Sequence, residues 1–252
     1  MVEVLILSIV QGITEFIPVS SSSHLILVSE FVNLNNQNLS IDVSLHIGSF
    51  LAVITYFRKD ISDFIKNKDL FFKIFLSSLP VMIVGYFLVK YSLIDQLRNI
   101  KIIGWMTIIF GMLLYLSDKF KVEKKIDSNF NYKSAIFIGL FQILSLVPGV
   151  SRSGIAITAA RILKFTRFES AKISFLLSIP TLGAVSLYGL SNILNSQDEI
   201  FSTINLLSIL FSFACSFITI KYFLKMMKSF SLNIFVIYRV FLGTIILIYY
   251  YL

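Results

Sequence analysis

Six apolar stretches dominate this sequence, each close to the roughly 20 residues that a helix needs to cross a lipid bilayer. A soluble domain carries about a quarter charged residues, whereas this chain of 252 residues is 14% charged and 56% hydrophobic. The sequence therefore predicts an all-α polytopic membrane protein with six transmembrane helices. These spans are expected at 41–58, 71–90, 101–117, 171–192, 203–222 and 233–251.

Two further apolar regions are interrupted by polar residues and prolines. Residues 2–33 are broken by Pro18 and four consecutive serines, Ser20 to Ser23, and residues 134–164 are broken by the run from Pro148 to Gly154. Each remaining piece is about three helical turns long, too short to cross a bilayer alone. Irregular backbone persists at membrane depth only when protein buries it or when it lines a wet cavity. The pattern predicts two re-entrant helical hairpins.

The predicted elements occur in the same order twice: a hairpin, then three spans. We therefore expect residues 1–252 to form a single integral membrane domain of two half-repeats, 1–120 and 130–252. An odd number of spans in each half gives the halves opposite orientations, so the repeat has inverted topology. A weak sequence repeat agrees with this plan: Gln11, Pro18, Val19, Ser20 and Ser21 resemble Gln142, Pro148, Gly149, Val150 and Ser151.

Basic residues predict how the chain is oriented. They gather around 58–68, 119–133, 161–172 and 221–228, whereas the opposite ends of the spans carry Lys90, Arg98 and Lys101. Because positive loops mark the cytoplasm, both termini are expected outside. The net charge of +8 lies in short gaps between spans, so nucleic acid is not needed as a partner. A single cysteine, Cys215, excludes an intrachain disulfide.

The two hairpin tips carry the groups capable of chemistry. In the first tip (residues 11–24), Gln11 and Glu15 share a helix face, Pro18 ends the helix, and the serines can cap the next one. The second tip (residues 148–154) adds Arg152, whose guanidinium can hold phosphate oxygens in a bidentate fork. Helix N-termini favour anions. The tips therefore predict a buried site for a phosphate ester with an apolar tail.

Plainer interpretations stay open for several of these residues. Serine runs in membrane helices often serve close packing, and His24 and His46 could be hydrogen-bonded residues that face the bundle. Arg152 and Glu15 could form only a structural ion pair. Arg239, in the last span, is interpreted as a structural or snorkelling charge.

At both tips the chain resembles the undecaprenyl-pyrophosphate phosphatase, or bacitracin-resistance, family. The first family signature, [E/Q]-x3-E followed by F-x-P-V-S-S-x-x-H, is matched by Gln11, Glu15, Phe16, Pro18, Val19, Ser20, Ser21 and His24. The second signature, P-G-x-S-R-S-G, is matched by Pro148, Gly149, Ser151, Arg152, Ser153 and Gly154.

This resemblance implies hydrolysis of undecaprenyl pyrophosphate to undecaprenyl phosphate and inorganic phosphate at the outer face of the bacterial cytoplasmic membrane. Such a reaction recycles the lipid carrier for cell-wall synthesis and confers bacitracin resistance. The active site would open to the periplasmic or extracellular side. The resemblance also implies a divalent cation, Mg²⁺ or Ca²⁺, and polyprenyl pyrophosphate and membrane lipid as partners. A homodimer stays open.

The catalytic residues expected on this basis are Glu15, Ser21, His24 and Arg152. Ser21 would attack the terminal phosphorus, with His24 or Glu15 accepting its proton; a water molecule activated by Glu15 is the alternative nucleophile. Glu15 is also the expected metal ligand. A carrier or flippase that uses the same anion site without hydrolysis is the competing function. The expected substrate-binding residues are Gln11, Ser20, Ser22, Ser151, Ser153 and Gly154.

Overall fold

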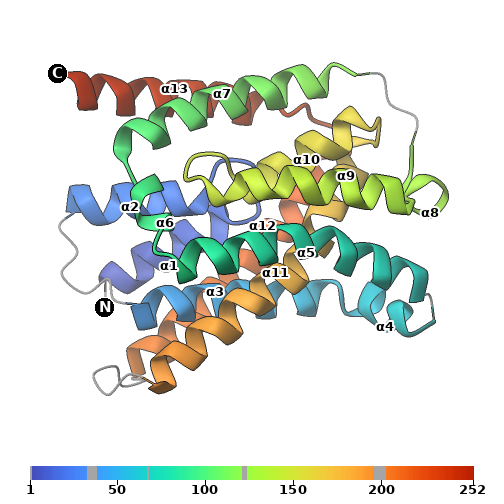
Figure 1. Cartoon of the computed structure of the whole chain (residues 1–252), viewed down its shortest axis with the longest axis horizontal. Coiled ribbons are helices and arrows are strands. Elements are labelled where there is room, and N and C mark those ends of the chain that lie inside the picture. The colour runs from blue at the N-terminus through green and yellow to red at the C-terminus, as the bar shows by residue number, and fades with distance from the viewer. Residues whose placement is uncertain (1, 33–38, 67, 121–123, 196–202) are drawn as a thin grey trace.

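The computed structural model describes residues 2–32, 39–66, 68–120, 124–195 and 203–252, and within these ranges the chain is helical apart from turns and one isolated β-bridge between Lys124 and Phe165. Figure 1 shows the helices packed side by side in layers. The helices are α1 (Val2–Thr14), α2 (Ser21–Val32), α3 (Leu39–Tyr56), α4 (Arg58–Lys66), α5 (Lys68–Lys90), α6 (Ile94–Leu97), α7 (Ile100–Asp118), α8 (Ile126–Asn129), α9 (Tyr132–Ile143), the 3-10 helix η1 (Leu144–Leu146), α10 (Arg152–Ile162), α11 (Arg167–Asn195), α12 (Thr203–Met226) and α13 (Asn233–Tyr251).

Among the described residues, five helices are long and apolar enough to cross a membrane: α5, α7, α11, α12 and α13. The remaining predicted span, at 41–58, corresponds to α3, an apolar helix of 18 residues that ends at Tyr56. After Phe57 the chain continues as α4, which opens with Arg58 and Lys59 and was not predicted. The structure therefore confirms an all-helical chain with several candidate spans.

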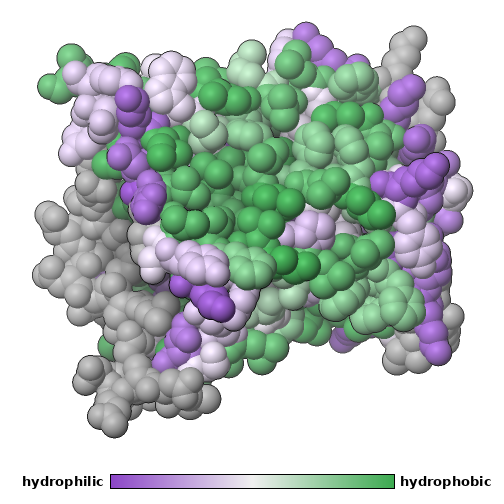
Figure 2. Space-filling model, viewed as in Figure 1, coloured by the Kyte–Doolittle hydropathy of each residue, from purple (hydrophilic) through white to green (hydrophobic). Residues whose placement is uncertain are grey.

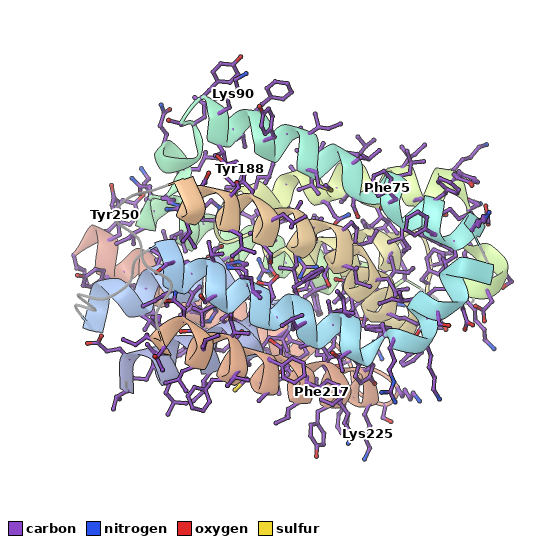
Figure 3. All side chains as sticks on the ribbon, turned by 90° about the horizontal axis from the view of Figure 1, so that it is seen from below. Phe75, Lys90, Tyr188, Phe217, Lys225 and Tyr250 are labelled. Atoms are coloured by element: carbon purple, nitrogen blue, oxygen red, sulfur yellow. The ribbon has the colours of Figure 1, made fainter. Side chains whose placement is uncertain are left out.

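The surface between the ends of these helices is hydrophobic. Leu187, Ile237 and Phe241 expose between 66% and 72% of their surface, and Figure 2 shows a broad hydrophobic band with hydrophilic residues toward its margins. Figure 3 places Lys90 and Lys225 at opposite ends of the bundle. A contiguous apolar surface of this kind suits lipid and not water.

Both interrupted apolar regions form two short helices joined by irregular backbone, as the sequence predicts. The first pair is α1 and α2, separated by residues 15–20, and the second is α9 and α10, separated by η1 and a turn. Each short helix has between 11 and 13 residues. The helix order short, short, long, long, long therefore occurs twice along the chain, if α4, α6 and α8 are set aside.

The first short helix of each half packs against a long helix of the other half. α1 packs against α12 of the second half, and its counterpart α9 packs against α5 of the first half, which is the counterpart of α12. Glycines allow both contacts: Cβ atoms at Gly12 and Gly139 would collide with Cys215 of α12 and with the backbone of Ser77 in α5. The long helices follow the same symmetry, since α3 packs on α12, α11 on α5, α3 on α11 and α7 on α13. The tips of both halves are thereby brought into the same bundle.

A cluster of charged residues around Asp118 joins several helices at one end of the bundle. Asp118, at the end of α7, accepts hydrogen bonds from Arg167 Nε and Nη2 at 2.8 and 2.9 Å and from the backbone N–H of Leu232 at 3.2 Å. Arg161 Nε lies 3.2 Å from the same carboxylate, and the Arg161 side chain is 1% exposed. The sequence placed Arg161 and Arg167 among the loop charges, whereas the structure uses them to join α7, α10, α11 and α13.

Candidate active site

Each tip contains a serine with unusual backbone geometry immediately before a helix. Ser20 has a φ of 81° and precedes α2, and Ser151 has a φ of 73° and precedes α10. Positive φ is uncommon outside glycine and costs about 1–2 kcal/mol per residue. Ser151 Oγ accepts a hydrogen bond from the Gly154 backbone N–H at 3.1 Å, which caps α10. Matching strain at two equivalent positions marks both tips as functional candidates.

The carboxylate of Glu15 is the point where the two tips meet. Ser21 Oγ donates a hydrogen bond to Glu15 Oε2 at 2.6 Å, and Arg152 Nη2 donates to Glu15 Oε1 at 2.7 Å. Gln11 Nε2 also donates to Oε2, at 3.2 Å. Glu15 is 7% exposed, so this is a buried cluster of α1, α2 and α10 residues. The structure contains the Glu15–Arg152 ion pair that the sequence left open as a plainer interpretation, and it adds the serine hydroxyl to this pair.

Further hydrogen bonds fix the position of the second tip. Ser153 Oγ donates to the backbone carbonyl of Ile17, in the first tip, at 2.8 Å. Arg152 Nη1 donates to the carbonyl of Ser174 in α11 at 3.3 Å, and Ser174 Oγ donates to the carbonyl of Ser153 at 3.4 Å. The Arg152 guanidinium is therefore held by α11 as well as by Glu15.

The polar groups of the predicted substrate-binding serines have various partners. Ser20 Oγ lies 2.9 Å from Ser23 Oγ and 3.4 Å from Ser22 Oγ, and Ser22 is exposed. Ser151 Oγ lies 3.2 Å from Ser153 Oγ, whose other contact ties the two tips together. The structure brings all these serines to the tips, and their contacts with substrate stay predictions.

Both ring nitrogens of His24 have partners other than Ser21. Its Nδ1 lies 2.7 Å from the backbone carbonyl of Ser20, and its Nε2 lies 2.6 Å from the hydroxyl of Tyr238 in α13. The two rings are stacked, with centroids 5.7 Å apart. Because the carbonyl requires a proton on Nδ1, Nε2 accepts from Tyr238 in the neutral imidazole. The sequence analysis did not predict a role for Tyr238, because no nearby motif distinguishes it from the other tyrosines of the chain.

His46 also lies near this cluster. Its Nδ1 lies 2.8 Å from the carbonyl of Asp42, one turn earlier in α3. It is close enough to the Glu15 carboxyl to interact with it electrostatically. The interpretation of His46 as a hydrogen-bonded histidine that faces the bundle agrees with these contacts.

Arg239 connects both tips from α13. Its guanidinium donates to the backbone carbonyls of Pro18 in the first tip and of Gly149 and Val150 in the second, at 3.2, 2.8 and 3.1 Å. A fourth bond reaches the carbonyl of Thr107 in α7 at 3.1 Å. Arg239 is 0% exposed, so the structural interpretation is confirmed and snorkelling is wrong. These four bonds surround the guanidinium with carbonyl dipoles. Within the described ranges no acidic side chain forms an ion pair with Arg239.

Two glycines make room for this arginine. A Cβ on Gly154 would lie 2.9 Å from Arg239 Nη1, and a Cβ on Gly111 would lie 3.1 Å from Arg239 Cβ. Gly149 has a φ of 97°, which side chains rarely adopt, and a Cβ there would lie 2.7 Å from the carbonyl oxygen of Ile103. The predicted binding residue Gly154 thus also has a packing role.

The donor set at Glu15 suits a hard divalent cation that shares its ligands with a phosphate. Mg²⁺ is commonly bound through one or two carboxylates and substrate phosphates. Glu15 supplies a carboxylate, and the buried Gln11 Oε1 beside it has no hydrogen-bond partner. Within the described ranges there is no group of three His, Cys, Asp or Glu side chains that could form an all-protein metal site. These residues fit a cation that the substrate helps to hold.

The sequence profile of the family described as bacitracin resistance protein BacA matches residues 4–245. The chain belongs to the BacA family. Among its relatives, an undecaprenyl-diphosphatase of Pelagibacter ubique (strain HTCC1062) is 49% identical over 251 residues, covering 99% of this chain and 98% of the relative. Undecaprenyl-diphosphatases of Aliivibrio salmonicida (strain LFI1238) and Jannaschia sp. (strain CCS1) are 38% and 36% identical, each covering 96% or more of both chains. These BacA-family relatives are named as enzymes, and the match includes both tips.

Proposed function

We propose that this chain hydrolyses undecaprenyl pyrophosphate to undecaprenyl phosphate and inorganic phosphate. The observation that carries the proposal is the 2.6 Å hydrogen bond from Ser21 Oγ to Glu15 Oε2, in a buried cluster with Arg152. A serine needs an adjacent base to act as a nucleophile. The names of its close relatives supply the substrate and the reaction.

In this mechanism Ser21 Oγ attacks the terminal phosphorus and Glu15 takes its proton. The bond from that phosphorus to the bridging oxygen breaks, undecaprenyl phosphate leaves with the proton that Glu15 had taken, and a phosphoserine remains. Water then attacks the phosphoserine and gives a proton to the ionised Glu15. Glu15 passes this proton to Ser21 Oγ as the phosphorus–Oγ bond breaks, which restores the hydroxyl and releases inorganic phosphate. Glu15 is favoured over His24 because both nitrogens of His24 lie against other partners. A water nucleophile activated by Glu15 is the competing version.

Arg152 and the two helix N-termini bind the pyrophosphate. Arg152 would exchange part of its contact with Glu15 for phosphate oxygens, which frees the carboxylate to accept a proton. The first N–H groups of α2 and α10 point toward the tips and favour an anion there. A cation held by Glu15 and Gln11 Oε1 would neutralise phosphate charge.

We place this site in the bacterial cytoplasmic membrane, open to the outer face, with both termini outside. The support is the repeated order of two short helices and three long ones, together with the basic residues around 58–68 and 221–228. In this arrangement α1–α2 and α9–α10 are re-entrant hairpins that enter from opposite sides. Hydrolysis there recycles the lipid carrier for cell-wall synthesis and confers resistance to bacitracin.

Phosphate release by the purified protein tests the reaction. Wild type is expected to release one phosphate per undecaprenyl pyrophosphate with Mg²⁺ or Ca²⁺, and Glu15→Gln, Ser21→Ala and Arg152→Lys are expected to lose most of this activity. Thr55→Ala, which removes an exposed hydroxyl of α3 bonded to the Leu51 carbonyl, is the control and should stay active. A folded wild type that binds the lipid and releases no phosphate would favour a carrier or flippase instead.

Acid quenching during turnover distinguishes the two nucleophiles. A phosphorylated peptide that contains Ser21 is expected in wild type and absent in Ser21→Ala. Ser21→Ala turnover near the wild-type rate, without any phosphopeptide in wild type, would assign the attack to water.

A further inference from the structure

A cavity of about 240 Å³ lies between α2, the start of α7 and the second half of α13. Apart from His24 and Tyr249, its walls are aliphatic, and they include Leu27 and Val28 of α2, Ile100 of α7 and Leu242 and Ile246 of α13. In Figure 1, α2 lies on the same side of the molecule as the C-terminal end of α13. Such a lining excludes a free anion and suits hydrocarbon.

The cavity is open toward the lipid-facing surface. Ile245 and Tyr249, on its rim, are 46% and 56% exposed. From Leu242 to Tyr249 the lining follows α13 for seven residues, or about 10 Å at 1.5 Å per residue. A molecule in the bilayer can therefore enter from the side, without crossing the protein.

The cavity begins beside the proposed nucleophile. His24 lines it and lies one helical turn, about 5 Å along the axis, after Ser21 in α2. Any hydrocarbon that leaves a phosphate bound at Ser21 and Arg152 therefore meets this apolar lining within a few bonds.

The equivalent place in the other half of the molecule is filled. There α10 packs directly on α7, and buried Ile155, Ala156 and Ile157 take part in the core. α2 is the counterpart of α10 and α13 the counterpart of α7. α2 meets α13 through Leu27 and Ile246, and beside this contact the cavity stays open. The two halves differ where a substrate chain must leave the site.

We propose that this cavity binds the isoprene units next to the pyrophosphate and thereby selects polyisoprenyl substrates. The proposal rests on the phosphatase function above and deepens it. Ligand pockets commonly have volumes of about 300–1,000 Å³, so a cavity of this size holds only the first part of a long chain. The remaining isoprene units lie in the bilayer.

Tryptophan substitutions on α13 test the proposal. Ile245→Trp fills the rim, and Leu242→Trp fills the interior; Phe241→Trp, on an exposed residue one turn before Ile245 and outside the lining, is the matched control. Each lining variant is expected to raise KM for undecaprenyl pyrophosphate about tenfold or more, because it expels at least one isoprene unit. Inhibition by inorganic pyrophosphate, which needs only the anion site, should change less than about twofold.

The outcomes separate the proposal from the function on which it rests. Unchanged KM in both lining variants, an equal rise in Phe241→Trp, or an equal loss of pyrophosphate inhibition would overturn the cavity assignment while wild type remained active. Ile245→Trp carries this test if Leu242→Trp does not fold, since Ile245 is partly exposed.

Photolabelling gives a readout that does not require hydrolysis. An isoprenyl pyrophosphate with a photoreactive group on its first units should label α13 between Leu242 and Tyr249, even in an inactive enzyme. Labelling without phosphate release in wild type would support the cavity and reject the phosphatase. Competition by excess phosphatidylglycerol that removes the label would show an ordinary acyl-chain site and reject isoprenoid selection.

Discussion

Replacing Arg239 by methionine tests whether one buried side chain holds the two tips together. Methionine has a similar length and donates no hydrogen bond. The carbonyls of Pro18, Gly149 and Val150, which lie outside helices, then lose the guanidinium donor. Loss of the guanidinium hydrogen bond costs less at the Thr107 carbonyl, because this carbonyl lies inside α7 and can keep its helical hydrogen bond.

The magnitude follows from these three carbonyls. A buried polar group left without a partner costs about 1–3 kcal/mol, so the free energy of unfolding should fall by at least about 3 kcal/mol. Removal of the buried charge recovers part of its desolvation penalty, which keeps the expected total near this lower value. About 3 kcal/mol corresponds to roughly a hundredfold change in the folding equilibrium.

Unfolding in mixed detergent micelles measures this effect. The chain has one tryptophan, Trp105 in α7, whose fluorescence can follow the transition. Arg58→Met, at an exposed position in α4, is the matched control and should stay within about 0.5 kcal/mol of wild type. Arg239→Lys should be intermediate, because an ammonium keeps the charge but lacks the planar fork.

Two results would refute this reasoning. The free energy of unfolding of Arg239→Met could lie within about 0.5 kcal/mol of the wild-type value, which would mean that the carbonyls find other donors. Alternatively, the variant could be destabilised yet keep full phosphatase activity after correction for folded protein. The tips would then be positioned by the contacts of Arg152 and Ser153 without the α13 arginine.

Three further predictions follow from single contacts. Gly154→Ala should destabilise the protein by about 1–3 kcal/mol in the same unfolding assay, because its Cβ collides with the buried guanidinium of Arg239. Gly85→Ala, whose Cβ has one contact at 3.3 Å, is the control and should be neutral or slightly stabilising. Tyr238→Phe keeps the ring stacked on His24 and removes the hydroxyl, so kcat should fall about fivefold with little change in KM; unchanged kinetics would exclude a positioning role. Asp118→Ala should lower the free energy of unfolding by about 3 kcal/mol, because it leaves the buried Arg161 without its carboxylate and also removes the partner of the partly exposed Arg167. A thermal midpoint equal to wild type would contradict this.

The helix plan was accessible from the sequence because hydrophobic length and Pro–Ser or Pro–Gly interruptions are local signals. The boundaries were less accessible where charges lie at helix ends. The span expected at 171–192 is part of α11, which begins at Arg167. Its first turns contain Arg167 and Lys172, which pair with Asp118 and Asp60. A span boundary predicted from hydropathy falls at such charged residues. In the structure, their ion pairs with other helices allow the helix to include them.

The candidate site was predictable in part for the same reason. Glu15, Ser21 and Arg152 lie in compact motifs, and their convergence follows from two breaks in one bundle. Tyr238 and Arg239 contact the first tip across more than 200 residues of sequence. A tyrosine and an arginine in a span are equally compatible with interfacial anchoring, so only the packing of α13 against α7 and the tips assigns their roles.

The charges at the tips favour the anion that the proposed mechanism places there. Around the two breaks, Glu15 carries one negative charge, whereas Arg152 and the fully buried Arg239 carry two positive ones. The N-termini of α2 and α10 add positive potential at the same place. A buried excess of positive charge is costly in a low dielectric, and a pyrophosphate lowers that cost when it binds. In the proposed mechanism Arg239 would contribute at a distance to the field that attracts the pyrophosphate, and Arg152, which bonds to Glu15, would contact it.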